Sequence, residues 1–133
     1  MENKIRKITR QVLKEFISKR ELEAIENYAD AIFSDIDVDV EFSKHFLDRV
    51  NDPRNKKEIK PEELEDVFTK TRSKHGDKIA KMKDYEEAVI NDTHSDINIP
   101  FASSTNKKGK KEVVNKTIMR KKDFLTTNPK LKV

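Results

Sequence analysis

The sequence predicts an α+β fold in which N-terminal helices pack on a small, mainly antiparallel sheet. Three observations predict it: apolar residues recur at helical spacing near the N-terminus, residues 35–42 alternate between acidic and apolar, and short apolar stretches separated by polar turns follow residue 85. A chain of 133 residues, 34% hydrophobic and 41% charged, has room for one modest core. We expect a single domain over 1–133, made of a helical region (1–34), a strand–helix–turn–helix unit (35–76), antiparallel strands (85–122) and a basic tail (123–133).

The N-terminal region carries two helical patterns. Residues 3–18 place apolar side chains on one stripe and lysine and arginine on the opposite face. Ser18 and Glu21 then have the spacing of a capping box, which marks a helix start. The second helix turns five side chains inward: Leu22, Ile25, Ala29, Ile32 and Phe33. One continuous helix is the alternative, because no glycine or proline forces a break. The apolar stripe of this region fits either packing against the core or contact with a partner helix.

Between residues 35 and 64 the spacing of apolar residues changes from the alternation of a strand to the spacing of a helix, and a proline-containing turn then separates two helices. Residues 35–42 predict a half-buried strand whose acidic side faces solvent, and the absence of glycine excludes a calcium loop of the EF-hand type. Ser43 is a good N-cap for a short helix over 44–51, with Phe46, Leu47 and Val50 on its apolar side. Pro53 ends this helix, because proline cannot continue it.

The rest of the chain predicts one more helix and then strands. Pro61 suits a first helical turn and Gly76 a C-terminal stop, while residues 77–84 fit either a longer helix or a cover over the core. Strands are expected at 87–90, 97–102 and 112–119, with Gly109 at a hairpin tip. In the tail, Phe124, Leu125 and Leu131 are candidates to pack against the domain, while Pro129 and the lysines favour an irregular backbone.

Several classes of protein are excluded or disfavoured by composition. The chain has no cysteine, so disulfides and thiolate metal sites are absent. No apolar run approaches the roughly 18 residues that span a bilayer, and the N-terminus lacks a secretory core, so we expect no membrane partner and an intracellular location. Gly76 and Gly109 form no nucleotide-binding loop, and three scattered histidines form no zinc site, so no cofactor is expected.

Charge is distributed unevenly along the chain. Residues 104–133 carry ten lysines and arginines against two acidic residues, a net charge of +8, so the first 103 residues sum to −4 within the total of +4. A basic block on an acidic domain suggests a polyanionic partner, and the sequence leaves RNA and DNA both open. The candidate nucleic-acid-binding residues are Arg54, Lys56, Lys57, Lys107, Lys108, Lys110, Lys111, Lys116, Arg120, Lys121 and Lys122.

Two histidines are candidates for chemistry. His45 and Arg49 lie four residues apart, so their side chains share one helix face, where an arginine can hold a phosphate while an imidazole exchanges a proton. An exposed polar pair is the structural alternative. His75 stands beside Gly76, where a charge favourable to a helix end is the simpler interpretation.

The run from Ser43 to Arg49 resembles the His-Leu-Leu-Asp-Arg segment of the RegB-type phage endoribonucleases, small α+β proteins related in fold to RelE-like toxins. The resemblance implies that His45 is an acid/base residue and Arg49 a phosphate contact. It also implies metal-independent cleavage, in which the RNA 2′-hydroxyl attacks the adjacent phosphate. The second histidine of that family aligns with Thr69, and His75 replaces it only if the helix end folds back.

The whole chain is also similar to small uncharacterised phage proteins that carry the same HFLDRVNDPRN and KTIMRKKDF runs. Two functions therefore remain open. One is a phage-type accessory protein, in the host bacterial cytoplasm or the virion, that binds nucleic acid or a host or phage protein through a basic C-terminal surface. The other is a RegB/RelE-like endoribonuclease that uses His45 and Arg49. The oligomeric state is not predicted.

Overall fold

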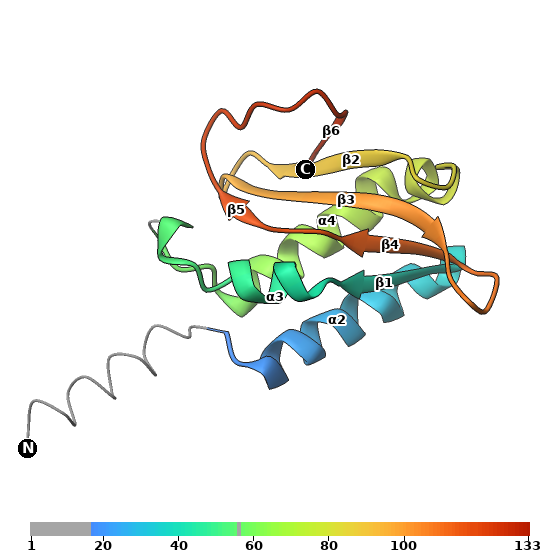
Figure 1. Ribbon diagram of the computed structural model, residues 1–133, viewed down its shortest axis with the longest axis horizontal. Coiled ribbons are helices and arrows are strands. Elements are labelled where there is room, and N and C mark those ends of the chain that lie inside the picture. The colour runs from blue at the N-terminus through green and yellow to red at the C-terminus, as the bar shows by residue number, and fades with distance from the viewer. Residues whose placement is uncertain (1–16, 56) are drawn as a thin grey trace, which may run out of the picture.

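The computed structural model describes residues 17–55 and 57–133, and it confirms the α+β prediction. Most of the helix expected over 3–18 lies outside the described residues. The elements in chain order are α2 (Lys19–Phe33), the 3₁₀ turn η1 (Ser34–Ile36), β1 (Val38–Phe42), α3 (Lys44–Arg49), the 3₁₀ turn η2 (Pro53–Asn55), α4 (Pro61–Ala80), β2 (Glu87–Asp92), β3 (Ile97–Thr105), β4 (Lys111–Asn115), β5 (Met119–Arg120) and β6 (Lys130–Lys132) (Figure 1).

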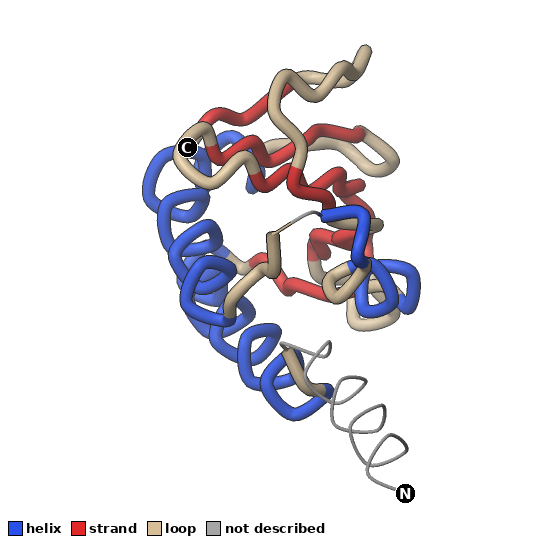
Figure 2. Tube along the Cα trace, turned by 90° about the vertical axis from the view of Figure 1, so that its left-hand side faces the viewer, coloured by secondary structure: helices blue, strands red, loops and turns tan. Residues whose placement is uncertain are grey.

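The strands form one mixed sheet in the order β1-β4-β3-β2-β6, with β5 paired to β3. The central pairs β2/β3 and β3/β4, and the short pair β3/β5, are antiparallel. The outer pairs β1/β4 and β2/β6 are parallel. The long helices lie along one side of the strands (Figure 2), so the core is a layer between helices and sheet.

The aromatic side chains of β1, α3, α4 and β3 lie in the core. The rings of Phe42 and Phe46 stack at 4.3 Å, and Phe68 lies 5.6 Å from Phe42. Phe101 is fully buried on β3. Leu47, expected on the apolar side of α3, is instead 37% exposed, because only Phe46 and Val50 of this turn point into the core.

Helix α2 begins where the capping box predicts. Ser18 Oγ accepts from the backbone N–H of Glu21 at 3.1 Å, and Glu21 Oε1 accepts from that of Ser18 at 3.1 Å. Ser18 has an extended backbone (φ −75°, ψ 166°), so the interpretation of one continuous helix through this point is wrong.

Helix α2 also covers the outer edge of β1. The carboxylate of Asp30 accepts from the N–H of Val40 at 2.9 Å, and that of Glu26 accepts from the N–H of Phe42 at 2.7 Å. Residues four apart on a helix thus satisfy donors two apart on a strand, which protects an edge that would otherwise invite pairing. The strand is shorter than predicted, because Asp37 adopts φ 57° and ends η1.

Two boundaries in the second half differ from the predictions. Helix α4 continues through Gly76 to Ala80, so the predicted stop there is wrong. A Cβ at Gly76 would lie 2.6 Å from Nη1 of Arg72. Nη2 of the same guanidinium pairs with Asp35 at 2.7 Å, so the glycine makes room for an ion pair between residues distant in sequence. The strand predicted over 112–119 is split into β4 and β5.

The tail is ordered rather than irregular. β6 pairs with β2, and the N–H of Val133 donates to the carbonyl of Asn91 at 2.9 Å. Leu131 and Val133 are 2% and 7% exposed. Burial of these two apolar side chains offsets the conformational entropy lost when the segment is ordered. Lys130 and Lys132, which alternate with them, are exposed to solvent.

Candidate nucleic-acid interface

A cavity of about 850 Å³ opens between α3, the turn before α4, and β5. Residues from three separate parts of the sequence line it. Six of the predicted site residues are among them: His45, Arg49, Lys57, Arg120, Lys121 and Lys122. The structure therefore brings the His45/Arg49 pair and the basic end of β5 to one concave surface.

Helix α3 presents His45 and Arg49 to this cavity. Ser43 caps the helix, its Oγ accepting from the N–H of Phe46 at 3.1 Å, and buried Phe46 fixes which face is outward. His45 Nε2 accepts from Arg49 Nε at 3.3 Å, so the predicted one-turn contact is present. Arg49 Nη1 also pairs with Asp52 at 3.0 Å. In this geometry a neutral His45 carries its proton on Nδ1.

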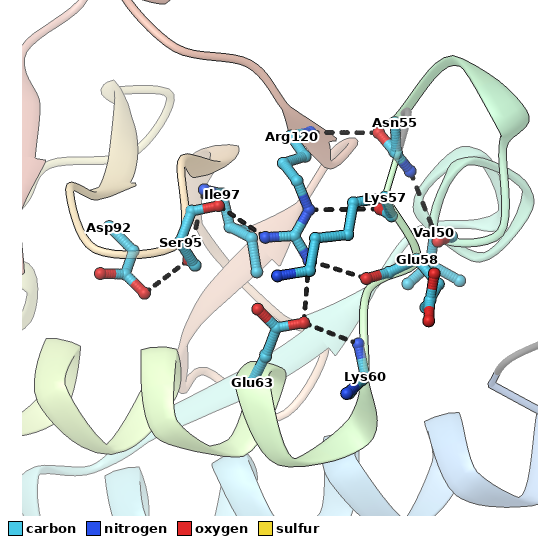
Figure 3. Close-up of polar contacts among 10 residues, drawn as sticks. All are labelled: Val50, Asn55, Lys57, Glu58, Lys60, Glu63, Asp92, Ser95, Ile97 and Arg120. Atoms are coloured by element: carbon cyan, nitrogen blue, oxygen red, sulfur yellow. Dashed lines mark hydrogen bonds and ion pairs between the residues drawn. The ribbon is translucent and has the colours of Figure 1, made fainter.

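Asn55 joins the end of α3 to β5. It is 5% exposed, its Nδ2 donates to the carbonyl of Arg49 at 3.1 Å, and its Oδ1 accepts from the N–H of Arg120 at 3.1 Å. Figure 3 shows the bond between Asn55 and Arg120, together with a further contact from Asn55 Nδ2 to the carbonyl of Val50 at the end of α3. The amide thus sets the relative position of two walls of the cavity.

Arg120 is the centre of the polar contacts in Figure 3. Its guanidinium donates to three backbone carbonyls, those of Lys57 at 3.2 Å, Glu58 at 2.8 Å and Ser95 at 2.6 Å. It also pairs with Glu63 at 2.8 Å, and its side chain is only 10% exposed. Because these groups occupy the guanidinium, we assign Arg120 to holding the cavity together rather than to contacting phosphate.

The ion pair between Arg120 and Glu63 is reflected in the ionisation of Glu63. Burial opposes the charged form, but hydrogen bonds from Arg120 and from the N–H of Lys60 outweigh burial and keep the pKa of Glu63 below its usual value. The carboxylate therefore stays charged at neutral pH.

Asn98 holds the other side of the cavity. This fully buried residue donates to the carbonyls of Asp96 at 3.0 Å and Lys121 at 2.9 Å, and it accepts from Asn91 Nδ2 at 2.7 Å. Sequence reasoning missed Asn55, Asn98 and Asp96. Asn98 left one signal, because an asparagine between two isoleucines of an apolar strand needs buried hydrogen-bond partners.

Three lysines of the lining form no ion pair within the described residues, although Lys57 lies close enough to Glu63 for its charge to help lower the pKa of that carboxyl group. Lys57, Lys121 and Lys122 line the cavity and are exposed. Within residues 17–55 and 57–133, none of the three has an acidic group in ion-pair contact. They are therefore available to an anion from outside.

The remaining basic candidates lie elsewhere. Lys107, Lys108, Lys110 and Lys111 belong to the β3–β4 hairpin, at the end of the sheet away from β5 (Figure 1). Lys110 pairs with Asp39 at 3.3 Å, Lys111 Nζ bonds the carbonyl of Met82, and Lys116 pairs with Glu87. The structure thus divides the expected basic surface in two. Lys56 and the side chain of Arg54 lie outside the described part.

Neither candidate for a second histidine position lines the cavity. His75 Nε2 bonds the carbonyl of Lys132 at 2.7 Å, which ties α4 to β6. Thr69 Oγ1 bonds the hydroxyl of Tyr28 at 2.7 Å on the face between α4 and α2. The helix end does not fold back towards His45.

A second cavity, of about 620 Å³, lies between α2 and β1 and is acidic. Its carboxylates are Glu23, Glu26, Asp30, Asp39, Glu41 and Glu112. A hydrogen bond with the carboxyl of Glu41, partial burial and the negative charges of Glu41 and Asp39 raise the pKa of Glu112 to about 7. Two neighbouring carboxyl groups therefore share a proton below neutral pH.

Replacing Glu112 by glutamine is expected to stabilise the protein at pH 8 by up to about 1 kcal/mol, since like charges on paired strands repel. A raised carboxyl pKa stabilises the fold below the unfolded value of about 4.3, and this stabilisation is lost as pH rises through about 7. The gain from Glu112→Gln should therefore shrink towards pH 5 in urea unfolding. Glu65→Gln, on the exposed face of α4, is the control. A gain that is the same at both pH values contradicts the shared proton.

Comparison of the chain with protein-family models, with curated proteins and with solved structures finds no match. Within the described ranges, no helix has the length and apolar character needed to cross a membrane. In the same part of the chain, no group of three or more histidine, aspartate or glutamate side chains is arranged to hold a metal ion.

Proposed function

We propose that this protein binds the phosphodiester backbone of a nucleic acid at the cavity lined by His45, Arg49, Lys57, Lys121 and Lys122. The observation that carries the proposal is the convergence of His45 and these four cationic side chains, from segments more than 60 residues apart in sequence, on one concave surface. Phosphate contacts of this kind supply most of the affinity for nucleic acids.

The arrangement favours an extended polyanion over a single small anion. Lys57 comes from the turn before α4, whereas Lys121 and Lys122 directly follow β5, so these charges come from two separate segments. A phosphate chain can offer one phosphate to each segment, and Arg49, which pairs with Asp52, lines the same cavity. We further propose a role in the host bacterial cytoplasm or the virion, which rests on the resemblance of the HFLDRVNDPRN and KTIMRKKDF runs to small phage proteins.

The test is binding of labelled single-stranded RNA and DNA over a range of salt concentrations. We expect the logarithm of the association constant to fall with the logarithm of salt at a slope of roughly −2 to −3, because each neutralised phosphate on a single strand contributes about −0.7. Salt-insensitive binding, or none, contradicts the proposal. A host or phage protein would then be the remaining partner, and copurification with and without nuclease would find it.

A second candidate function is metal-independent RNA cleavage. It is favoured by the 3.3 Å contact between His45 and Arg49 in the same cavity. If Arg49 turns to a bound phosphate, His45 Nε2 is released to exchange a proton. His45 Nε2 takes the proton of the 2′-hydroxyl as that oxygen attacks phosphorus, the bond from phosphorus to the 5′-oxygen breaks, and the imidazolium or a water returns a proton to the 5′-oxygen. The products are a 2′,3′-cyclic phosphate and a 5′-hydroxyl.

Cleavage is expected to persist in EDTA and to fall by about 10²–10⁴-fold when His45→Ala and Arg49→Ala are combined, as for loss of a general acid or base. The readout is gel analysis of structured and single-stranded RNA. His94→Ala, in the β2–β3 turn outside the cavity, is the control and should cleave as the wild type does. Cleavage that survives the double substitution removes this candidate and leaves the binding function intact.

A further inference from the structure

Asp96 is an acidic residue in the lining of the otherwise basic cavity. Among residues 17–55 and 57–133, its carboxylate has neither a hydrogen-bond donor nor a cation in contact. Asp52, the other acidic residue of the lining, is engaged by Arg49. Asp96 therefore presents an uncompensated negative charge at the place where we propose phosphate to bind.

The turn that contains Asp96 does not need this carboxylate. The side-chain bonds of the turn come from Asp92, which accepts from the N–H of His94 at 3.1 Å and from Ser95 Oγ at 2.7 Å. The backbone of Asp96 is fixed separately: its N–H donates to Asp92, and its carbonyl accepts from the N–H of Lys121 at 2.9 Å. The φ of 62° favours glycine, asparagine or aspartate, but it does not call for a charge.

An uncompensated carboxylate beside a phosphate site lowers affinity for any polyanion by repulsion. It raises affinity only for a ligand that offers an N–H or O–H donor close to the bound phosphate, because hydrogen bonds to a charged acceptor are strong. The hydrogen-bonded backbone fixes the Cα position of Asp96, so only the side-chain torsions of this residue become ordered when such a donor arrives.

We propose that Asp96 is a specificity-determining residue, which accepts a hydrogen bond from a donor group of the nucleic acid next to the phosphate held by the lysines. This inference rests on the proposed function and adds to it a selection among nucleic acids. The donor has two sources in a nucleotide: the ribose 2′-hydroxyl, which DNA lacks, and an N–H group of a base, which in uracil is the ring N3–H alone.

The experiment measures the affinities of single-stranded pentanucleotides for the wild type, Asp96→Asn and Asp96→Gly. The sugar arm compares RNA and DNA of one sequence. The base arm compares oligouridine whose central base is N3-methyluracil, which has no N–H, with strands carrying a central uridine, guanosine, adenosine or cytidine. Both substitutions suit φ 62°, so the turn and the Lys121 bond are kept, and circular dichroism checks the fold.

The wild type is expected to prefer the donor-bearing ligand by about tenfold in at least one arm. In Asp96→Gly this preference should disappear while affinity for the disfavoured ligand rises, since the repulsion is gone. Asp96→Asn, which keeps an acceptor oxygen without the charge, should keep part of the preference. If Asp96 had a purely structural role, its replacement would change the affinities for all ligands by the same factor.

Two failures are distinguishable. If the wild type binds none of the pentanucleotides at low salt, the proposed function is wrong and the inference falls with it. If the wild type binds them with no preference in either arm, or with a preference that Asp96→Gly retains, the inference alone is overturned.

Discussion

Replacing Arg120 by methionine is expected to lower the free energy of unfolding by about 3 kcal/mol, because it breaks a partly buried ion pair and leaves its partner charged. Methionine keeps most of the apolar stem, so the loss comes from the guanidinium. Glu63 is left without its cation, and the carbonyls of Lys57, Glu58 and Ser95 lose their donor. Urea unfolding followed by circular dichroism measures the change.

Lys116→Met is the matched control. It removes a cation from the pair with Glu87, where both side chains are about half exposed, and exposed pairs contribute up to about 1 kcal/mol. Arg120→Lys keeps the charge with fewer donors and should fall between the two. A loss below about 1 kcal/mol for Arg120→Met means that the guanidinium does not hold the cavity together.

Replacing Lys57, Lys121 and Lys122 together by glutamine is expected to weaken nucleic-acid binding by roughly a hundredfold at physiological salt, since these cations supply the phosphate contacts. The three side chains have no ion pair to lose among the described residues. Stability should therefore stay within about 0.5 kcal/mol of the wild type, as for other surface changes. Fluorescence anisotropy with a labelled single strand measures the affinity.

The control for this variant removes the same charge elsewhere. Lys107, Lys108 and Lys130 are exposed and lie outside the lining of this cavity. Their combined replacement by glutamine should change the affinity several-fold at most, through the net charge alone. Equal losses in the two triple variants would mean that binding follows overall charge and not the cavity.

Much of the local structure follows from neighbouring residues, and was predicted for that reason. The capping box at Ser18, the cap at Ser43 and the hairpin at Gly109 each depend on a few adjacent positions. The contact between His45 and Arg49 follows from helical spacing. The α+β class follows from the change between the two periods along the chain.

The cavity itself depends on contacts distant in sequence. Asn55 reaches Arg120 across 65 positions, and Arg120 reaches Glu63 across 57, and neither pairing leaves a local pattern. For the same reason Arg120 looked like a phosphate contact when only its charge was visible. Gly76 was predicted to end a helix because the reason for a glycine at this position is not local. The space beside Gly76 is taken by Arg72, whose partner Asp35 lies 37 positions away in the sequence.

The central claim is that the free lysines of this cavity neutralise phosphates, and the salt slope tests it most directly. The slope of log association constant against log salt should become shallower by about 2 in the Lys57/Lys121/Lys122 variant, about 0.7 for each lost contact on a single strand. The slope of the Lys107/Lys108/Lys130 variant should match the wild type. An unchanged slope in the first variant, or an equal change in both, would contradict a phosphate-binding role for this cavity.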